Sequence, residues 1–385
     1  MKIKRLICAF LSVSVLALSG CGQTEVKEVD MKTITLSSSQ ISDVNAKVDK
    51  ELTDCNFSGS AAITLNTQSV YEKSFGFSNE KKDKKNTNAT EYQISSVSSV
   101  FTAVAAAMLI DEGKLKKTDT LAVFFKSAAS NAVIKDITVE DLLLKNVDFG
   151  DYTNSFISAT DQLVKYNNLA KNENKKNYET IKNDISAFIL NVSKYHRSET
   201  PASNYYLLGR IIEKVSKTDY KEYVKKNIID RLGLNHTDFV SQKKKLSGYD
   251  TNLGKWRYSD EYPIYSSFGY LYSAYGITSS ASDLSKLFSA IINNKLTKIN
   301  ILREAKKSDS NYGYGLTVDG RNLAVKGETY LNSSYVFINP ESLECSILLS
   351  NSVGKYGIKE VGKDLHGVIN SKINGILLEN AMGSK

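Results

Sequence analysis

The sequence contains few of the residues that hold metal ions or form disulfides. Its 385 residues include three histidines, at positions 196, 236 and 366, and four cysteines. The histidines are scattered and do not have metal-ligand spacing, so we expect neither a zinc site nor another metal, and nothing in the sequence points to a cofactor. Cys55 and Cys345 would be allowed to pair if the chain is exported, but the cysteine count alone does not establish a disulfide.

Long apolar runs are also scarce, and the longest stands at the start of the chain. Lys2, Lys4 and Arg5 precede an apolar stretch from Leu6 to Leu18, which is too short for a comfortable permanent span and is typical of an export signal. Leu18–Cys21 then resembles the lipobox of bacterial lipoproteins. Residues 1–20 are therefore predicted to be a lipoprotein signal peptide, and the lipid on Cys21 would anchor the chain to the extracytoplasmic face of a membrane. An ordinary secretory signal is the alternative.

The charge balance does not indicate a strongly charged partner. The net charge of +8 falls by three when residues 1–20 are removed. Such a mild basic bias favours an anionic wall or membrane surface at most, and it is commonly just solvated surface. The sequence has no nucleic-acid-binding motif, and an export signal argues against a nucleic-acid partner.

The first third of the chain predicts a tether, a helix, two strands and a second helix. Residues 21–42 are polar and are predicted to be a tether, followed by a helix over 43–54. Strands are expected over 57–65 and 69–76, joined around Asn66 and Thr67, and the lysine-rich run 81–85 is expected to be an exposed loop. From Val97 onward apolar residues recur at helical spacing until Gly113, and this helix should be buried because it is apolar nearly all round.

The rest of the chain predicts a helical insertion and then a return to strands. Residues 116–299 are predicted to be a mainly helical insertion, within which 155–200 is a polar, mobile excursion. Strands are expected over 312–318, 323–326, 335–338 and 346–349, and a final helix runs to about 378. The fold class is therefore α+β, with an antiparallel sheet formed by residues 43–115 and 300–380, whose two ends must meet in one sheet.

Five separated blocks of sequence resemble the class C β-lactamase and penicillin-binding-protein-like serine hydrolases. The likeness covers about residues 45–375 in the right order, and it implies an antiparallel five-stranded-type sheet flanked by helices. The matching blocks are Phe57–Ser60, Ile94–Leu115, Asn204–Val215, Tyr275–Ile277 with Ala281–Leu284, and Ser333–Ser334 with Ile338–Glu341.

The resemblance also implies three polar motifs around one cleft, and this chain departs from each. The family's Ser-x-x-Lys keeps its nucleophile position as Ser96 but has Ser99 in place of the lysine. Alignment without gaps puts Thr200, Pro201 and Ala202 on the family's Tyr-x-Asn. Tyr205 or Tyr206 could stand in for the missing tyrosine, although helix packing explains them better.

The third motif, Lys/His-Thr/Ser-Gly, falls on Val325, Lys326 and Gly327, of which only the glycine matches. A further family segment, His-Thr-Ser-Gly, is replaced by the residues at 145–148. The family's oxyanion-hole donors would be the backbone N–H groups of Ser96 and Glu328, and backbone donors survive side-chain substitution. In an unbroken strand Lys326 points to the opposite face from Val325, and Glu328 would repel anionic ligands.

These losses predict a protein that binds rather than catalyses. A serine hydroxyl needs a neighbouring base, and loss of that base costs on the order of 10⁴–10⁶ in turnover. The leading interpretation is a lipid-anchored pseudoenzyme that binds a cell-wall peptide or a protein partner, with an aromatic stretch between Trp256 and Tyr275 as one wall of the cleft. The alternative is a serine hydrolase, an esterase or D-amino-acid peptidase, that uses Ser96 with a non-standard base. A solute-binding lipoprotein is a weaker third reading, because nothing suggests two lobes closing on a hinge.

Overall fold

The computed structural model describes residues 35–66, 68–147, 149–157, 160–172, 174–191, 201–261, 263–353 and 365–382. The predicted signal peptide, the predicted lipidation site Cys21 and the motif position Thr200 lie outside these ranges. Within them, no helix combines the length and the apolar character that crossing a membrane requires.

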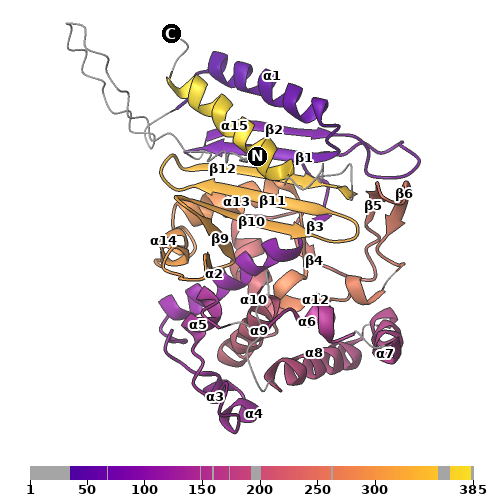
Figure 1. Cartoon of the computed structure of the whole chain (residues 1–385), viewed down its shortest axis with the longest axis vertical. Helices are drawn as coiled ribbons and strands as arrows, with labels where there is room; N and C mark the ends of the chain where they lie inside the picture. Colours follow the sequence, from indigo (N-terminus) through magenta and orange to yellow (C-terminus); the bar gives the residue numbers. More distant parts are fainter. Residues whose placement is uncertain are drawn as a thin grey trace, which may run out of the picture. The chain divides into compact units, whose positions relative to one another are not determined.

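The central element is an antiparallel sheet whose five long strands are extended at one edge by two short ones (Figure 1). Gly59 pairs with Ser350, so strands from the two ends of the chain do meet in one sheet, as predicted. The strand order is β2 (Gln68–Phe75), β1 (Gly59–Leu65), β12 (Glu344–Ser350), β11 (Ser333–Asn339), β10 (Asn322–Glu328), β9 (Leu316–Asp319) and β8 (Tyr312–Gly313).

Alternation along the strands puts an apolar core on each face of the sheet. On β1, Ala61 and Ile63 belong to a small core with α1 (Ser38–Asp54) and α15 (Leu365–Met382), whereas Ala62 belongs to the main core. The main core also contains α13 (Ala281–Ile292), which packs on β1 and β12. The five-stranded-type sheet flanked by helices is therefore confirmed.

The predicted tether ends earlier than expected. Helix α1 begins at Ser38 because Ser37 and Gln40 form a capping box, a Ser-x-x-Gln pattern that satisfies free N–H groups at the helix start. Leu36 is already buried and its backbone hydrogen-bonds the side chain of Gln68. The tether boundary at residue 42 is therefore wrong, and residues 36–42 belong to the folded domain.

The predicted apolar helix is α2 (Ser98–Asp111), and it lies in the main core. Its residues from Ser98 to Leu109 are all buried, as the nearly uniform apolar sequence indicates. Gly113, with a φ of +71°, follows its end. Helices α9 (Ala202–Ser216) and α12 (Phe268–Tyr275) pack against it.

The inserted region is mainly helical, but it also contains short strands that the sequence analysis missed. β7 (Ile277–Ser279) pairs with β3 (Tyr92–Gln93) and β4 (Asp238–Phe239), and β5 (Ser247–Asp250) pairs with β6 (Lys255–Tyr258) and β13 (Ser352–Val353). The shorter helices of the chain are α3 (Leu121–Phe124), α4 (Lys126–Ala129), α5 (Val139–Leu144), α6 (Tyr152–Ser155), α10 (Tyr220–Val224), α11 (Asp230–Leu232) and α14 (Ile301–Ala305), with single turns at Lys225–Ile229 and Pro263–Ser266.

The segment 155–200 is not a polar excursion over its described part. It forms α7 (Thr160–Lys171) and α8 (Lys175–Leu190), and α8 buries Ile181, Ile185 and Ile189 at helical spacing. The high content of Lys and Asn hid this apolar face. The prediction of a mobile excursion was therefore wrong. It relied on the overall polarity of the segment, whereas the spacing of the apolar residues decides whether a helix can pack against the domain.

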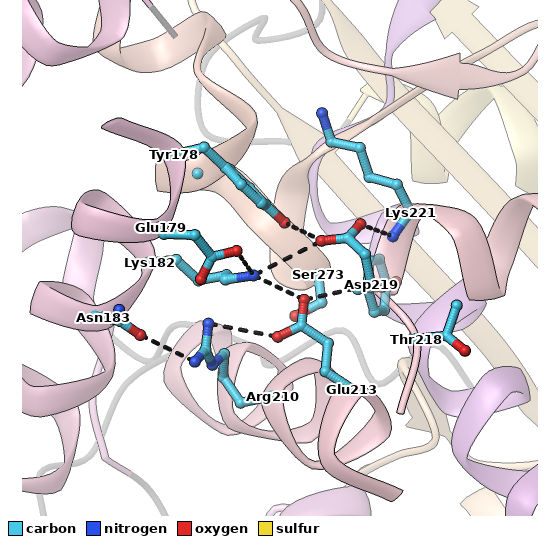
Figure 2. A network of polar contacts seen from close by, with 12 residues as sticks. Tyr178, Glu179, Lys182, Asn183, Arg210, Glu213, Thr218, Asp219, Lys221 and Ser273 are labelled. Atoms are coloured by element: carbon cyan, nitrogen blue, oxygen red, sulfur yellow. Dashed lines mark hydrogen bonds and ion pairs between the residues drawn. The ribbon is translucent and has the colours of Figure 1, made fainter. Parts of the chain in front are cut away.

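A buried charge cluster fastens α8 to α9 (Figure 2). The side chain of Lys182 on α8 is only 3% exposed, and its Nζ lies 2.9 Å from Glu213 Oε1 on α9 and 2.8 Å from Glu179 Oε1. Asp219 Oδ2, just before α10, is 3.7 Å away, and the amine lies over the Tyr178 ring at 4.4 Å. The carboxylates and the ring offset the cost of burying this amine.

Cys55 and Cys345 are both free thiols, so the disulfide that the cysteine count allowed is not formed. Cys345 is buried in β12, where it pairs with Thr64 of β1. Cys55 ends α1, and its Sγ donates to Glu51 O at 3.0 Å.

Candidate functional site

A cavity of about 820 Å³ lies where β10 faces the start of α2, and it brings together most of the predicted site residues. Thr200 is outside the described residues, and Gly327 packs behind the cavity wall rather than lining it. The predicted residues in the lining are Ser96, Ser99, Ala202, Val325, Lys326 and Glu328, and the others that the argument uses are Ser95, Asp151, Tyr265, Tyr270, Tyr275, Tyr312 and Tyr330.

Ser96 sits in a tight turn between β3 and α2. The turn spans Ser95–Val97, and Ser95 has a φ of +46°, a left-handed conformation that side chains other than glycine rarely adopt. Ser95 Oγ donates to Glu328 O at 3.2 Å, which ties the turn to β10. Strain of this kind persists only where the surroundings enforce it, and it concentrates at functional sites.

Gly327 allows β10 to lie directly against this turn. A Cβ at this position would be 2.4 Å from Ile94 O and 3.0 Å from Ser95 Cβ, so no larger residue fits without a shift. On the next strand, Ser334 Oγ donates to the same Ile94 oxygen at 2.8 Å. This close approach places Ser96 and Glu328, whose N–H groups are the predicted oxyanion donors, on one cavity.

The position of the missing lysine holds a hydroxyl that is already engaged. Ser99 is 2% exposed, and its Oγ donates to Ala274 O at 3.1 Å. Ala202 and Val325, at the other two motif positions, are buried and carry no polar side-chain group. These three residues therefore give the cavity no basic group.

Strand β10 keeps an unbroken register with β11 from Leu323 to Glu328. Lys326 and Glu328 are consequently exposed, whereas Val325 and Gly327 face the interior. The lysine contributes to the cavity lining from this exposed side of the strand.

Tyrosines dominate the cavity wall. Tyr265, Tyr270 and Tyr275 come from the aromatic stretch predicted as a wall, but Phe268 and Tyr272 of the same stretch lie in the core. Of its other members, Trp256 and Tyr258 are on β6, outside the lining, and Tyr262 is outside the described residues. Tyr205 and Tyr206 are fully buried and donate to Leu143 O and Gly269 O, so they serve packing.

Tyr312 and Tyr330 were not predicted as site residues and come from distant parts of the sequence. Burial raises the pKa of Tyr330 to about 12, and it also raises the pKa values of Tyr270 and Tyr312 above that of a free phenol. These three hydroxyls therefore stay protonated near neutral pH and act as hydrogen-bond donors rather than as bases.

Asp151 is a cavity residue that the sequence analysis also missed. Its Oδ1 accepts from Thr153 N at 2.9 Å and from Thr153 Oγ1 at 2.6 Å, because it caps the short helix α6. Its Oδ2 accepts from Tyr275 OH at 3.2 Å. The Asp-x-Thr pattern of this cap is present in the sequence, but only the fold could show that Asp151 lines the same cavity as Ser96.

The Ser96 hydroxyl makes no hydrogen bond to any group in the described part of the chain. A nucleophilic serine must pass its proton to a base within hydrogen-bond reach. The arrangement around Ser96 therefore retains the turn, the glycine and the cavity of a serine nucleophile site, while the proton-accepting partner does not appear among the described residues.

Comparison with known proteins agrees with this geometry. The model of the β-lactamase family matches residues 44–367. A Bacillus subtilis protein named as a penicillin-binding protein, PbpX, is 26% identical over 359 residues, which cover 90% of this chain and 84% of that protein. A Staphylococcus aureus protein named teichoic acid D-alanine hydrolase is 27% identical over 320 residues, which cover 76% of this chain and 72% of the relative.

Solved structures show the same fold. The crystal structure of FmtA from Staphylococcus aureus matches with a TM-score of 0.66 and 23% identity, over 86% of this chain and 88% of that one. A penicillin-binding protein from Bacillus halodurans matches with a TM-score of 0.65 and 21% identity, over 84% and 98% respectively.

Proposed function

This chain belongs to the β-lactamase family, and we propose that it is a catalytically inactive member that binds a D-alanine-bearing cell-wall ligand in the cavity around Ser96. The proposal depends on one observation about Ser96. The strained turn that holds this residue is present, but its hydroxyl has no hydrogen-bonded proton acceptor among the described residues. An alcohol without a base is a poor nucleophile at neutral pH, whereas the cavity around it remains a binding site.

The charges in the cavity favour a ligand that carries an ammonium group. Its charged lining residues are the carboxylates of Asp151 and Glu328 and the amine of Lys326. A D-alanyl ester presents a free ammonium and no carboxylate, so it suits two carboxylates better than an anionic penicillin does. The relative named teichoic acid D-alanine hydrolase supports this class of ligand. A cell-wall peptide with a free amine shares the same chemistry.

The first prediction concerns reactivity and binding. The full chain, treated with a fluorescent penicillin and with a fluorophosphonate, should show no labelling above that of Ser96→Ala. By calorimetry it should bind D-alanine methyl ester better than N-acetyl-D-alanine methyl ester, which keeps the ester and lacks the ammonium. Asp151→Asn, which can still cap α6, should weaken the ester about fivefold to tenfold. The matched control Asp309→Asn removes an exposed carboxylate outside the cavity and should change nothing.

A serine hydrolase is the second candidate, and a specific contact favours it. Tyr275 and Asp151 are hydrogen-bonded at 3.2 Å on the wall of the same cavity, so they form a pair that could relay a proton. If a fluorescent penicillin or a fluorophosphonate labels the wild type but not Ser96→Ala, the protein is a serine hydrolase and the proposal that it is inactive is wrong.

A further inference from the structure

We propose that a second, basic cavity beside the candidate site binds a polymer of phosphodiesters. Two lysine-rich runs, residues 81–85 and 243–245, are separated by more than 150 residues in the sequence. The fold brings them to one cavity of about 610 Å³, which we call the lysine groove. Its charged lining residues are Lys84, Lys85, Lys244 and Lys245, with Glu91 as the one acidic residue among them.

Carboxylates neutralise only two of the four lysines that line the lysine groove. Lys84 and Lys85 are exposed and form no ion pair with a carboxylate in the described ranges. Lys244 pairs with Glu91, and Lys245 lies 2.9 Å from Asp260 Oδ2. A hollow lined by unpaired ammonium groups attracts anions, and lysine binds phosphate as a mobile point charge without a fixed geometry.

Hydrogen bonds hold the two runs together, so the lysine groove is a built feature. Ser247 Oγ donates to Ser78 O at 2.9 Å, which joins the connection after β2 to the start of β5. Tyr258 OH on β6 donates to Glu80 Oε2 at 2.8 Å. These contacts fix the loop that carries the first lysine run beside the loop that carries the second.

The shape and chemistry of the groove fit a flexible polymer better than a membrane. Surfaces that bind anionic membranes combine basic residues with apolar side chains that enter the lipid. In the described chain the most exposed large apolar residues lie elsewhere, and none of them lines the groove; they are Val123, Val164, Phe188 and Leu253. The groove instead adds polar groups such as Thr90 and Tyr258 that can contact sugar or polyol hydroxyls.

One loop, residues 329–332, contributes to the lining of both the lysine groove and the Ser96 cavity. Thr329 and Tyr330 line the cavity, whereas Asn332, in the same loop, lines the groove. Tyr330 OH also donates to Ser259 O at 3.2 Å, next to the groove residue Tyr258. A polymer held by its phosphates in the groove could therefore present D-alanyl substituents to the cavity. The inference rests on the proposed function for the ligand of the cavity, but the groove's affinity for phosphodiesters can be measured separately.

The test uses a fluorescent poly(glycerol phosphate) that carries no D-alanine, so it offers the Ser96 cavity no D-alanyl group. The full chain should bind it, and affinity should fall steeply as salt is raised. The double variant Lys84→Gln/Lys85→Gln should weaken binding about tenfold or more, because it removes the two groove ammonium groups that have no carboxylate partner. The matched control Lys175→Gln/Lys176→Gln removes two exposed neighbouring lysines of α8, outside the groove, and should keep the wild-type affinity.

Three outcomes would overturn the inference: no binding of the polymer, an equal loss in both double variants, or binding to vesicles of anionic lipid but not to the polymer. None of these depends on whether Ser96 is labelled or on whether D-alanine methyl ester binds. Failure of the groove and failure of the proposed function are therefore distinguishable.

Discussion

At the scale of single residues, the buried carboxyl of Glu344 should make stability depend on pH. Glu344 lies on β12, 5% exposed, and burial raises its pKa to about 7, although Ser346 Oγ donates to it at 3.1 Å. Between pH 4.5 and 7 the folded chain keeps this proton while the unfolded chain releases it, so stability falls as pH rises through that window. The loss attributable to this group is at most about 3 kcal/mol, because the Asn374 amide lies against the Glu344 carboxylate and can donate to it, which favours the charged form.

Glu344→Gln imitates the neutral form and should abolish this loss. We expect the variant to be more stable than the wild type at pH 8 by up to about 3 kcal/mol and similar to it at pH 4. Urea unfolding at both pH values measures the difference. Glu341→Gln, at an exposed position on the preceding turn, is the control. A wild-type stability that is flat between pH 4 and 8, after correction for this control, would contradict the assignment.

Single residues also show what the sequence could and could not predict about the site. Ser96 was identified because it lies inside a recognisable block, and Gly327 because alignment without gaps puts it on the family's third motif; the structure places both at the same turn. Asp151, Tyr312 and Tyr330 were missed, because their role depends on which distant segments meet at the cavity. No local sequence pattern indicates which distant segments come together at the cavity.

At the scale of elements, the Lys182 cluster should determine whether α8 stays docked. Lys182→Ala would take the nearest cation from Glu213, which keeps Arg210 at 3.4 Å, and from the partly exposed Asp219, and we expect it to reduce the free energy of unfolding by about 2–3 kcal/mol. Lys175→Ala, at an exposed position of the same helix, should change it by less than about 0.5 kcal/mol. Urea unfolding compares the two. If Lys182→Ala lowers the free energy of unfolding by less than about 1 kcal/mol, the apolar face of α8 is enough to keep the helix docked without the charge cluster.

Elements were predictable where spacing and turn residues agreed. The two strands around Asn66, helix α2 and the late strands β10–β12 follow the apolar spacing of the sequence. The single strand predicted over 312–318 is instead two short paired strands, β8 and β9. The start of α1 and the helices α7 and α8 were missed because polar residues outnumber apolar ones there. In α8 even a lysine is buried, which hydropathy alone cannot anticipate.

At the scale of the whole molecule, a lipid on Cys21 would limit how far the folded domain can lie from a membrane. The folded domain has begun by Leu36, and Cys21 is the predicted lipid-bearing residue. Fifteen fully extended residues span at most about 50 Å, so a lipid on Cys21 would keep the domain within that distance of the bilayer. An anchored domain would therefore meet a polymer close to the membrane more often than one far out in the wall.

The lipobox-like sequence Leu18–Cys21 predicts where the protein is found in the cell. Cys21→Ser should move the chain from the membrane fraction to the medium, because a lipid attached through sulfur is the proposed anchor. Cys8→Ser removes a cysteine within the predicted signal peptide and should leave the protein in the membrane fraction. Fractionation followed by immunoblotting measures both variants, and a Cys21→Ser chain that stays in the membrane fraction would refute the anchor. If the anchor is correct, the released variant should still bind poly(glycerol phosphate) in solution, because the lysine groove lies wholly within the folded domain.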